Sequence, residues 1–208
     1  MIILIPARRN SKGLPFKNRK LFNCTVNKIP QELRGKTYVY TDDEILAGWS
    51  KENNLNYVPR DVVSDEQTTK EMAQSFVKKL KLESEDILML YLTYPDRTWS
   101  EVERAIDTYR SESARSLLGK KDVSTHPYLC MYEEEHGRGT QVIKHDVCRR
   151  QEYPDCFEIS HQVCIFNSDD VDELNSNLFN ENTFFFLVSG VVDVDNEEDL
   201  DGVKSYVN

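Results

Sequence analysis

Short apolar runs alternate with segments of helical period along this chain, and this alternation limits the possible folds more than any other feature. Apolar runs of strand length occur at 2–5, 37–40, 55–58, 86–92, 116–119, 162–167 and 183–188. Segments with helical periodicity lie between several of them, at 42–54, 68–83 and 98–112. Strands that alternate with helices usually pair in parallel, with the helices packed on the sheet. The sequence therefore predicts an α/β fold with a mostly parallel sheet flanked by helices.

The helical pattern is clearest in the segment 68–83. Met72, Phe76 and Leu80 follow one another at intervals of four residues and would form an apolar stripe on one face. Thr68 with Glu71 three residues later is typical of a capping box at a helix start. We therefore expect this helix to begin just after Thr68.

The stretch ARRNSKGLPFKN, residues 7–18, directly follows the first apolar run. Six cations and no acid lie between Arg8 and Lys20, although the 208-residue chain carries a formal net charge of −10. In parallel sheets, ligands bind beyond the carboxyl ends of the strands, which is where this loop begins. Its cations, small polar residues and glycine suit a phosphate group, but it matches neither a Walker A loop nor a dinucleotide fingerprint. A solvated basic surface loop is the alternative interpretation.

The composition narrows the class of protein. With 39% apolar and 30% charged residues, residues 1–208 are expected to form one soluble globular domain. Residues 121–160 are charged and without clear period, and we interpret them as an antiparallel excursion or lid within it. The net negative charge argues against nucleic-acid binding, and no apolar run is long enough to span a membrane. Five cysteines without metal-ligand spacing indicate reduced thiols and a cytoplasmic location.

Several motifs resemble those of the CMP-sialic acid synthetases, cytidylyltransferases that activate acidic nine-carbon sugars. IPARRNSKGLPFKN (5–18) is similar to their amino-terminal signature, and VDVDNEEDL (192–200) is similar to a motif further along. Weaker similarities follow the family's order at 39–46, 58–69, 90–98 and 150–157. The resemblance implies a Rossmann-like nucleotidyltransferase fold with CTP and Mg²⁺ as ligands. It also implies transfer of CMP to the anomeric hydroxyl of an acidic 2-keto sugar, with release of pyrophosphate.

The resemblance further implies roles for individual residues. Arg8 and Lys17 would be catalytic, facing the triphosphate and stabilising the charge of the leaving pyrophosphate. Asp193 and Asp195 would bind Mg²⁺, and their spacing on a strand would point both carboxylates to one face. A solvated acidic helix start is the alternative for this stretch, and residues 197–199 are expected to form one. The implied nucleotide-binding residues are Ala7, Ser11, Lys12, Asn18, Arg60 and Thr69.

Departures from the family pattern fall in the half that would hold the acceptor sugar. Tyr91 stands in place of a glutamine associated with the sugar, Glu158 in place of an arginine, and Ser160 in place of an asparagine. Exchanging arginine for glutamate beside an acidic sugar would change recognition. Either the acceptor differs from sialic acid, such as a Kdo-, pseudaminic- or legionaminic-type acid, or the chain is a catalytically silent nucleotide-binding module. Tyr91 is a candidate for binding the sugar, and Arg149 and Arg150 are candidates for binding its carboxylate. The alternative for the two arginines is that they form an exposed pair on the surface.

Two further expectations concern size and assembly. The segment 21–36 is shorter than its counterpart in the family, and Pro30 and Gly35 predict that it holds only a short helix. No side chain is singled out as a general base. The resemblance implies a homodimer, to which the aromatic residues Tyr128, Tyr132, Tyr153 and Phe157 would contribute.

Overall fold

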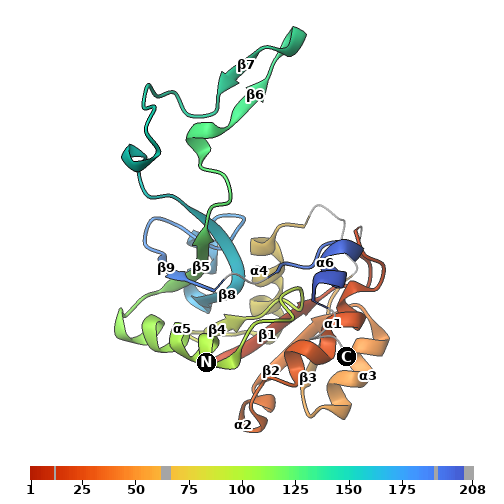
Figure 1. Cartoon of the computed structure of the whole chain (residues 1–208). Coiled ribbons are helices and arrows are strands. Elements are labelled where there is room, and N and C mark those ends of the chain that lie inside the picture. The colour runs from red at the N-terminus through yellow and green to blue at the C-terminus, as the bar shows by residue number, and fades with distance from the viewer. Residues whose placement is uncertain (12, 62–66, 190–191, 204–208) are drawn as a thin grey trace.

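The computed structural model describes residues 1–11, 13–61, 67–189 and 192–203. Strands and helices alternate through most of this range (Figure 1). The strands are β1 (Ile2–Ala7), β2 (Thr37–Thr41), β3 (Asn56–Pro59), β4 (Asp86–Met89), β5 (Ser116–Asp122), β6 (Met131–Glu133), β7 (Gly139–Gln141), β8 (Phe157–Asn167) and β9 (Phe184–Leu187). The helices are α1 (Lys17–Val26), α2 (Gln31–Arg34), α3 (Glu44–Glu52), α4 (Thr69–Leu80), α5 (Trp99–Ser111) and α6 (Glu197–Gly202), with short 3₁₀ segments η1 (Pro127–Leu129), η2 (Glu135–Gly137), η3 (Arg150–Glu152) and η4 (Ser168–Glu173).

Seven strands form the central sheet in the order β3-β2-β1-β4-β8-β5-β9. Neighbours pair in parallel except around β8, which runs antiparallel to both β4 and β5. The mostly parallel α/β architecture expected from the alternation is therefore confirmed. Because β1 and β4 are neighbours and parallel, their carboxyl ends lie at the same edge of the sheet.

Both faces of the sheet are buried under helices. In β1, Ile3 and Ile5 face a core completed by α1, α3 and α5, whereas Ile2 and Leu4 face a second core formed with α4 and η4. This two-sided burial explains why the first run is apolar at consecutive positions rather than alternating. Among the described helices, none combines the length and apolar character that crossing a membrane requires.

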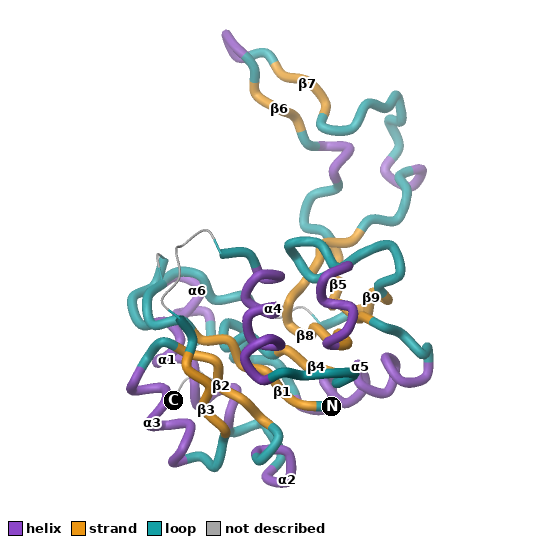
Figure 2. Tube along the Cα trace, turned by 180° about the vertical axis from the view of Figure 1, so that it is seen from behind, coloured by secondary structure: helices purple, strands orange, loops and turns teal. Residues whose placement is uncertain are grey.

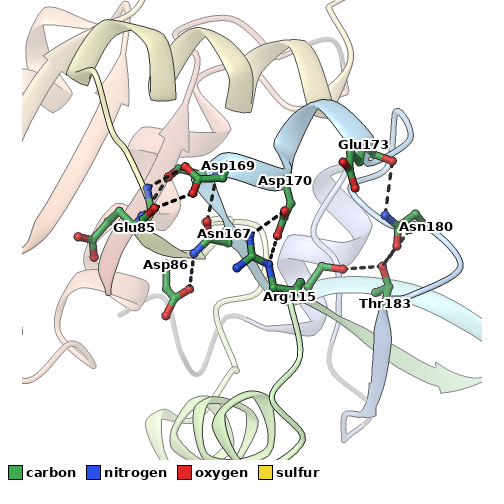
Figure 3. A network of polar contacts seen from close by, with 12 residues as sticks. Glu85, Asp86, Arg115, Asn167, Asp169, Asp170, Glu173, Asn180 and Thr183 are labelled. Atoms are coloured by element: carbon green, nitrogen blue, oxygen red, sulfur yellow. Dashed lines mark hydrogen bonds and ion pairs between the residues drawn. The ribbon is translucent and has the colours of Figure 1, made fainter.

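A polar network ties the elements together at the sheet edge where β4 and β5 begin (Figure 3). Arg115, just before β5, forms a bidentate ion pair with Asp170 of η4 at 2.5 and 2.8 Å. Asn167 donates to Asp86 at the start of β4, at 3.0 Å. Asp169 accepts hydrogen bonds from the backbone and hydroxyl of Ser84. This edge therefore has a structural network, and the opposite edge carries the cavity described below.

Residues 123–156, which we call the arm, project from the body of the molecule in both views (Figures 1 and 2). The antiparallel hairpin β6–β7 forms the far end of the arm. Asp122 pairs with Phe157, so the arm leaves and re-enters the body at adjacent strand ends. The excursion expected at 121–160 is present but shorter, because the backbone at both its ends continues the pairing of β5 with β8.

Three expectations about individual elements need correction. The segment expected to hold one short helix contains two, α1 and α2, because α1 already begins at Lys17. The strand expected to begin at residue 162 starts at Phe157. Asp193 and Asp195 do not lie on a strand. Among residues 192–195, the backbone N–H of Val194 donates to the carbonyl of Thr93 at 2.8 Å, and these four residues belong to no strand.

Candidate active site

A cavity of about 370 Å³ opens beyond the carboxyl ends of β1 and β4. It brings together residues from the cationic loop, the start of α4, the segment after β4, strand β8 and the segment before α6. Its lining residues are Pro6, Arg8, Ser11, Lys17, Asn18, Arg60, Gln67, Thr68, Thr69, Met72, Tyr91, Thr93, Tyr94, His161, Asp193 and Asp195.

The cationic loop contacts the segment before α6 directly. The Lys17 ammonium lies 2.8 Å from the Asp195 carboxylate, and Lys17 itself is only 9% exposed. At Gly13 the two backbones approach so closely that an added Cβ would lie 2.3 Å from the carbonyl oxygen of Asp195. Asn18 donates to the carbonyl of Arg8 at 2.8 Å, which fixes the start of the loop to α1. The loop and the aspartates therefore form one wall of the cavity.

Both aspartates are held by their neighbours. Tyr94 donates its hydroxyl to Asp193 at 2.9 Å, and burial raises the pKa of this phenol, so it keeps its proton. The backbone N–H of Asp195 donates at 2.8 Å to Asp199, whose carboxylate also forms the capping box of α6 with Asn196. Val194 between them is fully buried and anchors the segment to the core.

On the side of β3, the cavity holds a guanidinium with an unused donor. Arg60 donates to Gln67 at 2.6 Å and lies near the ring of Tyr40. Its Nε is buried and has no hydrogen-bond partner among the described groups. Burial also lowers the pKa of Arg60. A buried donor without a partner is costly, and a ligand that offers an acceptor here would satisfy it.

The centre of the cavity is lined by hydroxyl groups. The Thr69 and Tyr91 hydroxyls lie 3.2 Å apart, and burial raises the pKa of Tyr91 to about 12. Thr69 begins α4, whose preceding residue Thr68 completes the expected capping box with Glu71. Both hydroxyls can therefore donate to or accept from a polar ligand.

Most residues singled out in the sequence line this cavity, although their roles remain predictions. Ala7 is buried at the end of β1 and is not among the lining residues. Lys12 lies outside the described residues. The predicted residues that the structure brings together are Arg8, Ser11, Lys17, Asn18, Arg60, Thr69, Tyr91, Asp193 and Asp195.

Arg149 and Arg150 lie on the arm, exposed and apart from this cavity. Arg149 forms an ion pair with Glu152 at 3.5 Å, and Arg150 lines a separate hollow within the arm. Glu158 pairs with Lys121 at 3.3 Å on the β5–β8 ladder and does not line the cavity. The negative charge of Glu158 is thus balanced by the ammonium group of Lys121 on the neighbouring strand β5.

Several lining residues were not predicted from the sequence, notably Thr93, Tyr94 and His161. Thr93 and Tyr94 directly follow the apolar run 86–92, which extends past the end of β4 at Met89, and this position could have identified them. His161 lies within β8, a strand whose true start was not visible in the apolar pattern.

The aspartate pair fits the chemistry of a magnesium site. Mg²⁺ binds through one or two carboxylates together with phosphate oxygens and waters. Among the described residues, no group of three or more histidine, cysteine or acidic side chains could hold a metal by itself. Asp193 and Asp195 could therefore hold the ion together with a phosphate ligand.

Comparison with known proteins finds similarity along nearly the whole chain, although no protein-family model matches it. The chain is 24% identical to the N-acylneuraminate cytidylyltransferase of Streptococcus agalactiae serotype V, and the match covers 96% of this chain. The match covers 51% of that relative, so the chain spans about half the length of such proteins. It is also 22% identical to the post-translational flagellin modification protein B of Campylobacter coli, covering 96% of this chain and 92% of that one.

Solved structures are similar over nearly all of both chains. A CMP:2-keto-3-deoxy-manno-octonic acid synthetase complexed with CTP superposes with a TM-score of 0.69 at 14% identity, over 98% of this chain and 96% of the other. The chain has the fold of this synthetase. The 4-diphosphocytidyl-2C-methyl-D-erythritol synthase of Anaerococcus prevotii shares this cytidylyltransferase fold, with a TM-score of 0.68 at 13% identity, over 99% and 96% of the two chains. The Rossmann-like nucleotidyltransferase fold expected from the motifs is thereby confirmed.

Proposed function

We propose that this protein is a Mg²⁺-dependent cytidylyltransferase. It would transfer CMP from CTP to the anomeric hydroxyl of an acidic 2-keto sugar and release pyrophosphate. The observation that carries the proposal is the shared cavity in which the loop cations Arg8 and Lys17 meet Asp193 and Asp195, with Lys17 and Asp195 only 2.8 Å apart. The similarity to cytidylyltransferases in sequence and fold supports the choice of nucleotide.

Each wall of the cavity would have a part in binding the nucleotide. Arg8 and Lys17, together with Ser11 and Lys12 of the loop, would bind the triphosphate and stabilise the charge that develops as pyrophosphate leaves. Arg60 would use its unpaired Nε to bind the cytidine, with Thr69 nearby. Asp193 and Asp195 would hold Mg²⁺, which supplies further positive charge to the phosphates when bound.

The acceptor would bind on the side of the cavity beside β8. Tyr91 and Tyr94 offer hydroxyl groups there, whereas Glu158, the charge least suited to an acidic sugar, is paired with Lys121 outside the cavity. This arrangement supports a working acceptor site rather than a catalytically silent module. N-Acetylneuraminic, Kdo-, pseudaminic- and legionaminic-type acids remain the candidate acceptors.

The assembly and location follow the same proposal. A homodimer would cover the apolar side chains of the arm, where Met131 is 55% exposed and Tyr132 61% exposed. Arg149 and Arg150 could reach an acceptor only if the arm contacted a second subunit's cavity. A reaction that uses CTP would place the protein in the cytoplasm.

Pyrophosphate release tests the proposed function. Purified protein with CTP and Mg²⁺ should release pyrophosphate with at least one of the four acids, and UTP, GTP and ATP should support much slower turnover. Lys17→Ala and Asp195→Ala should each reduce turnover by about 100-fold or more while the circular dichroism spectrum stays unchanged.

Lys20 provides a matched control for these variants. Its ammonium pairs with Glu197 at 3.1 Å on the surface and does not line the cavity. Lys20→Ala should therefore keep normal turnover. CTP binding without turnover of any acid would reject the transferase in favour of a silent nucleotide-binding module, and near-normal activity of Lys17→Ala would remove Lys17 from the assignment.

A further inference from the structure

An irregularity in strand β8 places a histidine in the cavity. Along the β5–β8 pair, Leu118 faces Cys164 but the next residue, Gly119, faces Ser160, so three residues of β8 lie between consecutive partners. Gly119 permits this, since a Cβ there would lie 2.6 Å from the carbonyl of Ser160. Bulges of this kind redirect side chains beside active sites. The redirected residues include His161, which lines the cavity.

The hydrogen bonds of His161 determine which ring nitrogen carries its proton. Nε2 lies 3.1 Å from the backbone carbonyl of Asn177. Because a carbonyl oxygen only accepts, Nε2 must carry the hydrogen in this contact, and Nδ1 of the neutral ring keeps its lone pair. No described group hydrogen-bonds to Nδ1. The ring also packs edge-on against Tyr91, with centroids 5.9 Å apart.

The neutral form of this imidazole is favoured by its surroundings. Burial lowers the pKa of His161, although the contact with Asn177 opposes the shift. Burial raises the pKa of Tyr91, which lines the same cavity, to about 12, so this phenol keeps its proton. Asp193 already accepts a hydrogen bond from the Tyr94 hydroxyl, and in the proposed function it would bind Mg²⁺. Among the described lining residues beside β8, His161 is thus the available proton acceptor.

Resting on the proposed function, we propose that His161 is the general base of the transfer. Nδ1 accepts the proton of the acceptor hydroxyl as its oxygen attacks the α-phosphorus of CTP. The new bond joins that oxygen to the α-phosphorus, and the bond from the α-phosphorus to the oxygen bridging it to the β-phosphorus breaks. The electron pair of the broken bond leaves with pyrophosphate, and the proton stays on the imidazole until water removes it. The carbonyl of Asn177 accepts the hydrogen of Nε2 both before and after Nδ1 takes up the proton.

The test uses the acid that the wild-type protein turns over, chosen from the four named above. His161→Gln keeps a polar side chain but cannot take up a proton, and His161→Gly leaves space for a free imidazole. Both should lose about 100-fold or more in kcat, with the KM for CTP little changed. Added imidazole should restore the rate of His161→Gly in proportion to its concentration and leave the wild-type rate unchanged.

His136→Gly is the matched control. His136 lies at the exposed tip of the arm with a φ of 63°, which glycine adopts readily, so this variant should keep wild-type turnover. Turnover of His161→Gln within about threefold of wild type, well short of a general base's usual contribution, would overturn the inference and leave the proposed function standing. A loss of CTP affinity equal to the loss of rate would also overturn it, because a structural role would then account for the defect. Failure of the wild-type protein with every acid would instead overturn the proposed function, and this inference with it.

Discussion

Gly13 lies where the cationic loop and the aspartate segment approach each other closely. A methyl group there would lie 2.3 Å from the backbone carbonyl of Asp195, so the loop and the aspartate segment would have to separate. Overpacking of this kind costs about 1–3 kcal/mol. We expect Gly13→Ala to weaken CTP binding by about tenfold or more, because a loss of about 1.4 kcal/mol in binding free energy raises the Kd tenfold. Isothermal titration calorimetry with Mg²⁺ present would measure this Kd.

Gly48 supplies the comparison for that variant. It lies within α3, and a Cβ there would meet nothing within 4 Å. Gly48→Ala should bind CTP normally and unfold at an equal or higher urea concentration, because alanine favours helices over glycine. Equal CTP affinity of Gly13→Ala and wild type would show that the close approach is not needed for binding.

Single residues also show how far the sequence alone could go towards the site. Arg8, Lys17, Asp193 and Asp195 belong to two specific motifs, so the sequence already suggested that they meet. His161 belongs to no motif and reaches the cavity only through the irregular register of β8, which depends on how Gly119 packs against its neighbour. A contact decided by strand register cannot be read from residue spacing.

At the scale of elements, α3 is held by a charged cap. Asp43 accepts a hydrogen bond from the backbone of Ile45 and two from Arg19, at 2.7 and 3.0 Å. Burial alone would raise the pKa of Asp43, but these hydrogen bonds outweigh it, and the pKa lies below its usual 3.8. A carboxylate whose pKa is lowered by folding stabilises the protein above its unfolded pKa, and this contribution is lost as the pH falls through the folded value.

Asp43→Asn tests this contribution. Asparagine still caps a helix but carries no charge to pair with Arg19. The free energy of unfolding should fall by about 1.5–3 kcal/mol at neutral pH, measured by urea denaturation. The difference from wild type should shrink as the pH drops below about 4. A difference that stays constant down to acid pH would contradict the charged-cap explanation. Glu44 is exposed in the same turn, so the control Glu44→Gln should change the free energy of unfolding little.

The elements that were well predicted carry local signals of their own. Helix α4 begins where Thr68 and Glu71 predict, because both partners of its capping box lie within one turn. Helix α1 has no such signal: the residue before it, Phe16, has a left-handed backbone and makes no side-chain cap. Its first residue, Lys17, bonds to Asp195 in the segment before α6, 178 residues further along the chain. Local patterns therefore identified the seven strands of the central sheet and the capped helices, but not this helix.

For the whole molecule, the arm can be separated from the body by design. Asp122 and Phe157 pair at its base, so an Asn-Gly turn could replace residues 123–156 and close β5 and β8 as a hairpin. We expect the shortened chain to keep its circular dichroism spectrum and its CTP binding. If the arm mediates the proposed homodimer, sedimentation analysis should show a dimer for the full chain and a monomer for the shortened one. A shortened chain that remains dimeric would place the interface on the body.

The ion pair between Lys17 and Asp195 has a consequence for how the protein responds to its ligands. A bare triphosphate would approach two aspartates, and a bare divalent cation would have to compete with an ammonium group for one of them. Under the proposed function, each ligand would therefore remove an electrostatic obstacle to the other, and thermodynamic linkage would make the benefit reciprocal. We expect strong heterotropic cooperativity, so that a cell depleted of magnesium would leave this protein empty even where CTP is abundant.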